Sequence, residues 1–570
     1  MKLRNFKIIM ILSGILIVGS CKQQLDINKN PDALPSSFNL YPQLLTSAEV
    51  NLGFEAGSDL FRYTTQIMQM MSGQASQPNQ TYEYGRYNIT GSDENNVWSS
   101  IFATTLSDLE LVINQATAAG SPHYAGVAKI LKAYEFSLVV DTWGDVPYSE
   151  AQQLDLNTQP HYDDDDAIYP KLISLLTEAI NDVSATTSIL SPGTNSTFYT
   201  NGTFATARPF WIKLANTLKL RLLLHYSKKD PAFCVAQITA LVNTAGITFM
   251  ASNADNFQHL FFDVANQRSP ISAFEVSRPN YLFADAKMLG IMNAKSDPRR
   301  AFYFSSFPLV TGFIPINLTT NATTSGTVLK FPSTTGVVVN VGVSGNNIPA
   351  GTIVTALTAT DVTISNALTG SGAASGTIVN FAPNYIGVSA TSLPAAPNNN
   401  YSRIHTFLRG AVTTAAVGTN SAVYSGAAPQ RMISFAEYNF IRAEAALMGA
   451  PGNAQQFFTD GITASMQEAG VSAEDLAKYK ALNGTLTGSN AQKLQQIIEE
   501  KYIALFGVSV EPWTDWRRTG YPALSVPSNV INSVSAVPHT LFYPQSEIDL
   551  NPNCPGQKSA DLQNKVFWDQ

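Results

Sequence analysis

Two glutamates of one expected helix are the residues best spaced for acid–base chemistry. Glu437 and Glu444 lie seven residues apart, so they would share one face of a helix over residues 432–448, about 10 Å apart along its axis. Glycoside hydrolases hold their two carboxyl groups roughly 5–9.5 Å apart. Because the expected separation is too long, we favour structural roles for both glutamates, as partners of Arg442 or as caps of loops between helices.

Other residues that catalyse reactions or bind metals show no matching pattern. The six histidines are scattered, without the His-x-x-x-His spacing of zinc sites, and there is no G-x-S-x-G nucleophile elbow or phosphate-binding Gly-Lys loop. Residues 163–166 are four aspartates that could bind Ca²⁺, but they lack the glycine and alternate spacing of an EF-hand loop. Acidic residues also stabilise a helix N-terminus, which is the role we favour. We expect no catalytic residue, no metal and no cofactor.

Aromatic residues in a polar segment are candidates for ligand binding. Tyr82, Tyr84, Tyr87 and Trp98 lie among Gln, Asn, Thr and Gly in residues 78–98. Such rings can stack on a sugar ring or contact a peptide side chain. The alternative role is to anchor this loop to the core.

A second aromatic cluster, residues 513–518, places two arginines beside two tryptophans. This combination could make a cation–π or anion-binding site. The alternative, which we favour, is a structural cluster in which Asp515 and nearby carbonyl groups satisfy the guanidinium groups.

Apolar residues at helical spacing recur along most of the chain and predict the elements that position these side chains. The expected helices cover residues 42–55, 59–71, 96–115, 124–140, 169–183, 211–225, 432–448, 454–469 and 492–506. They follow one another in pairs separated by long loops, although no strict 34-residue period is visible. The pattern predicts a mainly α fold of tetratricopeptide-like helix pairs with a loop-rich face.

Residues 318–381 have a different composition. Only Lys330 and Asp361 are charged there, Tyr and Trp are absent, and turn residues separate β-branched runs at 337–341, 352–355 and 362–365. Such runs are typical of short strands. We therefore expect a small β-rich module inserted into a helical domain made of residues 21–317 and 382–570.

The first 20 residues read as an export signal. A cationic start is followed by an apolar run, residues 8–18, that is too short to span a bilayer, and then by Gly19, Ser20 and Cys21. The ending resembles a bacterial lipoprotein cleavage box, which predicts a signal peptide over 1–20 and lipidation of Cys21. Polar residues 22–38 would form a tether.

Composition limits the partners of the exported body. The 570 residues are 45% hydrophobic and 14% charged, which indicates a globular protein, and without residues 1–20 the net charge falls from −7 to about −10. This charge argues against nucleic acid or an anionic lipid surface as the main partner, so membrane contact would be through the lipid anchor only. Cys234 and Cys554 could pair, but their spacing does not require it.

Seven ordered motifs extend over nearly the whole chain outside the β-rich stretch. They are residues 25–31, 143–151, 211–221, 297–299, 435–445, 500–520 and 543–547. In these motifs the chain resembles the SusD/RagB family of outer-membrane lipoproteins of the Bacteroidetes, and more narrowly its SusD-like branch.

The resemblance implies a lipid-anchored protein that faces the cell surface and forms a lid on a SusC-like TonB-dependent transporter. It implies capture of glycans or peptides, delivery to that transporter and no general catalytic activity. The residues that bind ligands differ among members of the family, so the resemblance assigns no binding residue to this sequence. A surface-anchored hydrolase and a structural or adhesive surface lipoprotein remain the alternatives.

Overall fold

The computed structural model describes residues 40–570 except 74–79, 154–155, 200–201, 390–398, 420 and 532. The expected signal peptide 1–20, Cys21 and the tether 22–38 lie outside the described residues and stay predictions. The fold is mainly α-helical, as the periodicity predicted. The longer helices are α3 (Tyr41–Glu55), α7 (Leu106–Ala118), α8 (Pro122–Trp143), α9 (Asp165–Val183), α10 (Phe204–His225), α11 (Pro231–Val242), α16 (Phe435–Met448), α17 (Ala454–Ala469), α18 (Ala473–Asn483) and α19 (Asn490–Ala504).

Shorter elements connect these helices. The short helices are α4 (Asp59–Ile67), α5 (Gln80–Gly85), α6 (Gly91–Ser99), α12 (Pro270–Ser277), α13 (Ala286–Ala294), α14 (Arg300–Tyr303), α15 (Thr406–Arg409), α20 (Glu511–Thr519) and α21 (Gln545–Leu550). Two small antiparallel pairs join distant segments: β1 (Met71–Ser72) with β3 (Phe283–Ala284), and β2 (Phe257–His259) with β12 (Gln430–Ile433). A third pair, β10 (Val412–Ala415) with β11 (Ala422–Tyr424), is formed by consecutive strands.

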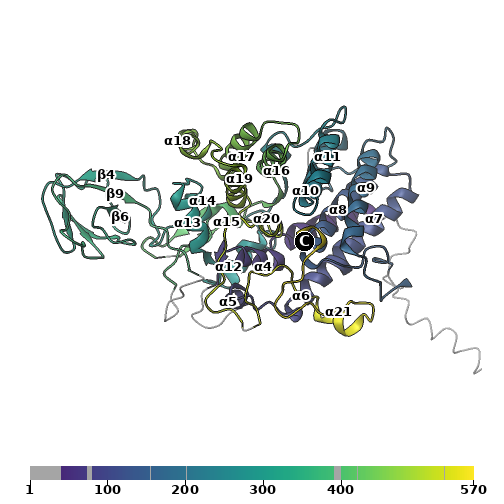
Figure 1. Ribbon diagram of the computed structural model, residues 1–570, viewed down its shortest axis with the longest axis horizontal. Helices are drawn as coiled ribbons and strands as arrows, with labels where there is room; N and C mark the ends of the chain where they lie inside the picture. Colours follow the sequence, from purple (N-terminus) through teal and green to yellow (C-terminus); the bar gives the residue numbers. More distant parts are fainter. Residues whose placement is uncertain are drawn as a thin grey trace, which may run out of the picture. The chain divides into compact units, whose positions relative to one another are not determined.

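Helix α8 is central to the first group of paired helices. It packs against both α7 and α9 (Figure 1), and nearly all of its side chains are buried. Gly126 allows the approach to α9, because a Cβ there would lie 2.8 Å from the carbonyl oxygen of Ala179. Helix α16 makes similar pairs with α17 and α19. The helical body is therefore built from packed helix pairs, as the sequence predicted.

Residues 78–98 are expected as a polar loop, but the described part, residues 80–98, is largely helical, so that expectation is wrong. Helix α6 begins after Thr90, whose backbone N–H donates to Asp93 Oδ2 at 2.8 Å in a capping box. The helix expected over 96–115 is interrupted by a π-helix, η2 (Ser100–Thr105). The helix expected over 59–71 ends at Ile67, because the backbone leaves the helical conformation shortly afterwards, at Gln69, whose φ is 53°.

The inserted β-rich region contains six strands, β4 (Ile316–Thr319), β5 (Val328–Lys330), β6 (Gly342–Gly345), β7 (Val354–Leu357), β8 (Asp361–Ile364) and β9 (Ile378–Ala382). They form two three-stranded antiparallel sheets, in the orders β4-β9-β6 and β5-β8-β7. Their apolar side chains form a cluster separate from the helical core. Residues 337–341 are not the expected strand, because Asn340 has a φ of 74° and the strand begins at Gly342.

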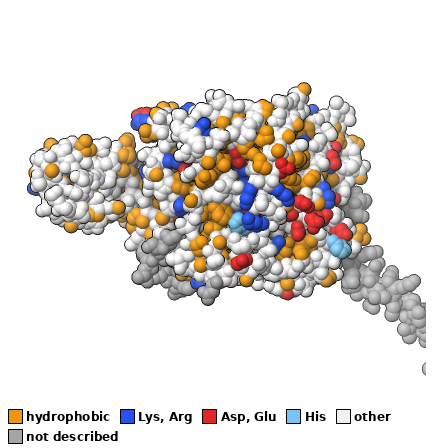
Figure 2. Space-filling view, viewed as in Figure 1, with side chains coloured by type: hydrophobic (Ala, Val, Ile, Leu, Met, Phe, Trp, Pro, Cys, Tyr) orange, Lys and Arg blue, Asp and Glu red, His pale blue; other side chains and the backbone are white. Residues whose placement is uncertain are grey.

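Charge is nearly absent from the surface of this region. Figure 2 shows mostly uncharged side chains over the strands, whereas acidic and basic side chains gather over the helices. The two charged residues face each other, with Lys330 Nζ 3.6 Å from Asp361 Oδ2. The region has few groups for attracting a charged partner.

We expect the helical body to fold without the inserted strands. Asn317 in β4 pairs with Asn380 in β9, so a two-residue Asn-Gly turn replacing residues 318–379 would close a hairpin without stretching the chain. Because the removed side chains form their own core, the melting temperature of the body should stay within a few degrees of the wild-type value in calorimetry. Aggregation, or loss of the cooperative transition, would show that the body depends on the insert.

Candidate binding site

The glutamates singled out for chemistry are buried ion-pair partners. Arg221 Nε donates to Glu437 Oε1 at 2.7 Å, and both side chains are at most 2% exposed. Arg518 forms two parallel bonds to the carboxylate of Glu444, of 2.7 and 2.9 Å. Arg442 instead donates to the carbonyl of Pro451, so the expected pairing of the glutamates with Arg442 is wrong. Neither carboxylate can reach a substrate in this arrangement.

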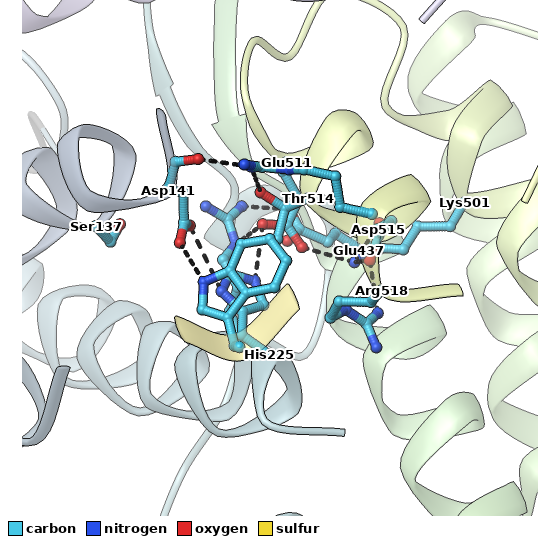
Figure 3. A network of polar contacts seen from close by, with 12 residues as sticks. Ser137, Asp141, His225, Glu437, Lys501, Glu511, Thr514, Asp515 and Arg518 are labelled. Carbon is cyan, nitrogen blue, oxygen red and sulfur yellow. Dashed lines mark hydrogen bonds and ion pairs between the residues drawn. The ribbon is translucent and has the colours of Figure 1, made fainter. Parts of the chain in front are cut away.

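These pairs belong to a larger polar network beneath the surface (Figure 3). Glu511 accepts from Lys501 Nζ at 2.8 Å and lies 3.5 Å from Arg221 Nε. Burial alone would raise the pKa of Glu511, but Lys501 and Arg221 hold it well below its usual value. The carboxylate therefore stays ionised and ties α10, α19 and α20 together.

The cluster at residues 513–518 is structural, as favoured from the sequence. The Arg517 guanidinium lies 3.9 Å from the Trp513 ring centroid and 4.7 Å from that of Trp568. It donates to the backbone carbonyls of Asp141 and His539. Arg518 also donates to Asp515 Oδ1 at 2.7 Å. The Nη groups of both arginines are thus bonded to protein groups, whereas their Nε atoms have no hydrogen-bond partner among the described residues.

The aspartate run lies at a helix N-terminus, as favoured from the sequence, although the side chain of the N-cap residue Asp164 makes no capping hydrogen bond. Helix α9 begins at Asp165, and Asp165 Oδ2 accepts the backbone N–H of Phe567 at 2.7 Å. Asp163 accepts the backbone N–H groups of Tyr148 and Ser149. Within the described part of the chain, no three His, Cys, Asp or Glu side chains are grouped to hold a metal ion.

The four predicted ligand-binding aromatics have different surroundings. Tyr84 and Tyr87 are 1% and 0% exposed, and Tyr84 packs edge-on against Tyr63 with ring centroids 4.7 Å apart. Both rings lie too deep to contact a ligand, so they take the alternative role of anchoring the segment to the core. Tyr82 is half-buried, and its binding role stays a prediction.

Trp98 lies in the wall of a cavity of about 240 Å³, here called the Trp98 pocket. Its ring stacks on Phe102, with centroids 4.2 Å apart and planes 26° apart. Prolines and polar groups complete the lining, which consists of Trp98, Phe102, Ala103, Ser107, Pro147, Ala151, Gln152, Asn157, Thr158, Pro160 and Glu547. An apolar floor with a few amide, hydroxyl and carboxylate groups is typical of a small-ligand site.

The local backbone departs from regular structure on both sides of this pocket. Phe102 is part of the π-helix η2, whose Ser100 and Thr105 hydroxyls both donate to the buried Glu55 of α3. π-Helices occur frequently at functional sites. Gln152, another lining residue, has a φ of 56°, a backbone conformation that residues other than glycine rarely adopt. Such strained residues cluster at functional sites.

Two polar side chains of the lining carry oxygen atoms that can accept hydrogen bonds from a ligand. Among the described residues, the buried Gln152 Oε1 has no hydrogen-bond partner. Glu547 is oriented by the Tyr162 hydroxyl, which donates to its Oε2 at 2.9 Å. A buried polar atom without a partner is uncommon in proteins, so Gln152 indicates an acceptor reserved for water or a ligand.

The two remaining cysteines are both free thiols, so the pairing left open from the sequence is not formed. Cys234 is buried, and burial raises the pKa of its thiol to about 12. None of the helices in the described ranges combines the length and apolar character needed to cross a membrane.

Comparison with known proteins defines the family. A profile of SusD-like proteins, described as starch-binding and associating with the outer membrane, matches residues 34–319 and 383–544. The chain belongs to the SusD-like family. The profile skips residues 320–382, which hold most of the inserted strands.

Solved structures confirm the SusD-like fold. A chitin-binding protein is 22% identical with a TM-score of 0.65, covering 93% of this chain and 99% of that chain. A chitin-binding SusD homologue from Flavobacterium johnsoniae is 19% identical with a TM-score of 0.64, covering 93% and 98%. A SusD homologue from Bacteroides fragilis is 20% identical with a TM-score of 0.65, covering 93% and 100%. No curated protein matches this SusD-like chain.

Sequence reasoning found one ring of the Trp98 pocket and missed the rest. Trp98 and Phe102 are four residues apart, a spacing that places two side chains on one helical face, and this signal could have predicted the pair. Gln152 and Asn157 follow the 143–151 motif and Glu547 ends the distant 543–547 motif, but neither motif indicates a binding role. Their convergence depends on how loops pack around α6 in this SusD-like protein.

Proposed function

We propose that this protein is a surface-exposed lipoprotein that binds glycans in the Trp98 pocket and delivers them to a SusC-like TonB-dependent transporter. The observation that carries the proposal is the stacked Trp98–Phe102 pair, which lines the same pocket as the amide of Gln152. Aromatic faces stack on sugar rings, while amides bond their hydroxyl groups. Membership of a starch-binding family and the chitin-binding relatives support a glycan over a peptide.

Glycan binding is tested by titration calorimetry of the chain without residues 1–21. N-Acetylchitohexaose and maltohexaose are the probes, since relatives bind chitin and the family profile is described as starch-binding. Saturable binding of one hexaose supports the proposal, and the absence of heat with both contradicts it. Incubation of the same mixtures without release of shorter sugars would argue against the hydrolase alternative.

The transporter partnership makes a prediction for Cys21. A lipid anchor and a tether would hold the protein at high effective concentration over its transporter. We expect Cys21→Ala to leave glycan affinity unchanged and to abolish glycan uptake by cells, measured with a labelled hexaose. The detergent-extracted wild-type protein should co-purify with a large β-barrel protein.

The controls separate this lid function from adhesion. Normal uptake by the Cys21→Ala strain would contradict the anchored mechanism, and extraction without a barrel partner would contradict the partnership. Replacement of residues 318–379 should leave uptake intact if the protein is a lid. Loss of surface attachment instead would favour an adhesive role of the insert.

A further inference from the structure

A second cavity lies between the end of α3 and the segment after β2, here called the His259 pocket. Its volume is about 340 Å³. Val50 and Phe54, one helical turn apart on α3, form one wall, and Phe261 packs edge-on against Phe54 with centroids 5.1 Å apart. Phe262 reaches the opening and is 53% exposed. The pocket thus offers aromatic surface both inside and at its mouth.

His259 carries polar atoms that the protein leaves unused. Its side chain lines the pocket and is 7% exposed, and neither ring nitrogen has a hydrogen-bond partner among the described residues. Burial lowers the pKa of His259 to about 4, so the ring is neutral at physiological pH, with one donor and one acceptor nitrogen. Because buried polar groups are normally paired, this ring indicates a partner from outside the chain.

Neighbouring elements leave space for this ring and fix the walls around it. Gly53 of α3 makes room for it, because a Cβ at Gly53 would lie 2.4 Å from His259 Cγ. The opposite wall is tied to α3 through the buried Glu49, which accepts from the Ser196 hydroxyl at 3.0 Å and the Thr197 hydroxyl at 3.1 Å. The backbone N–H of Phe262 donates to the carbonyl of Gln267 at 2.8 Å, and this bond joins the two ends of the segment 262–267.

The lining also restricts the chemistry of the occupant. The described lining residues include no Lys, Arg, Asp or Glu, while Thr194, Ser196, Thr197, Asn266 and Gln267 supply hydroxyl and amide groups. A charged ligand would lose hydration without gaining a counter-charge. A purely apolar ligand would leave the His259 nitrogens unpaired. Aromatic faces together with uncharged donors and acceptors match a sugar ring, which has apolar C–H faces and hydroxyl edges.

We propose that the His259 pocket binds one uncharged pyranose residue of a glycan, separately from the Trp98 pocket. The inference rests on the proposed glycan-binding function and adds a second sugar site to it. Phe262 would cover one face of the ring at the opening, and the imidazole would bond a hydroxyl or acetamido group deeper inside.

The test compares variants of the pocket by titration calorimetry with N-acetylchitohexaose and maltohexaose. We expect Phe262→Ala and His259→Phe each to weaken one of two binding events at least tenfold. His259→Phe keeps a buried ring and removes two unpaired nitrogens, so its melting temperature should equal or exceed that of the wild type. Val264→Ala is the matched control, since Val264 is 50% exposed on the same segment but does not line the pocket.

The outcomes separate this site from the proposed function. Unchanged binding in both variants, together with loss of binding in Phe102→Ala, would overturn the second site and leave the function standing. Absence of binding of either hexaose to the wild type would contradict both. A third outcome would also overturn the sugar assignment. In that outcome the tripeptide Ala-Phe-Ala binds saturably, and Phe262→Ala weakens the binding of the peptide but not the binding of either hexaose.

Discussion

Replacing Glu437 by alanine is expected to lower the free energy of unfolding by about 3–5 kcal/mol, the usual cost of breaking a buried ion pair. The substitution leaves the Arg221 guanidinium, which is 1% exposed, without the two bonds of 2.7 and 2.6 Å that it donates to Glu437. The carbonyl of Met432, at 2.9 Å from Nη2, and the Glu511 carboxylate, 3.5 Å from Nε, are the contacts that remain, and neither replaces the paired bonds to Glu437. Urea denaturation monitored by circular dichroism measures the loss.

Two variants show whether burial is the cause. Glu474→Ala removes a comparable bond of 2.7 Å to Lys478, but on the surface, where Glu474 is 78% exposed. Its denaturation midpoint should hardly change, because water screens exposed pairs. The double variant Arg221→Met with Glu437→Leu removes both charges and should recover much of the stability. A Glu437→Ala protein as stable as the Glu474→Ala protein would contradict the structural role of the network.

Most of the longer helices could be predicted because they are encoded locally, although α11 and α18 were not among those expected. Apolar spacing indicated α8 and α16 directly, and the glycine after α16, Gly449, adopts the left-handed conformation that ends a helix. The polar segment around Tyr84 and Trp98 resembles a loop in the sequence, because α5 and α6 are short and contain glycine at an end. The Thr90–Asp93 capping box was the local signal that could have corrected this.

Partners in the network could not be predicted because they are far apart in the chain. Arg221 and Glu437 are 216 residues apart, whereas Arg442, the partner expected from the sequence, is on the same helix as Glu437. Helical periodicity says which residues share a face, but not which distant helix that face meets. The same limit applies to the Trp98 pocket, where Glu547 comes from the C-terminal part of the chain.

The second large effect is expected in the Trp98 pocket. Phe102→Ala should weaken binding of the recognised hexaose by about 10- to 100-fold, since burying a phenylalanine ring contributes roughly 1.5–3 kcal/mol and 1.4 kcal/mol corresponds to tenfold. Phe233→Ala is the matched control, because Phe233 is 38% exposed and lies outside this pocket. Titration calorimetry measures both, and thermal melts verify that each variant is folded.

Gln152→Ala separates binding from packing in the same pocket. Its Oε1 bonds no described protein group, so its removal should cost the folded state no hydrogen bond at that atom. A hydrogen bond to the ligand contributes about 1 kcal/mol, and its loss should weaken hexaose binding roughly fivefold. Unchanged affinity in both Gln152→Ala and Phe102→Ala would contradict glycan binding at this pocket. Unchanged affinity in Gln152→Ala alone would leave the aromatic floor as the main contact, because stacking does not depend on the amide.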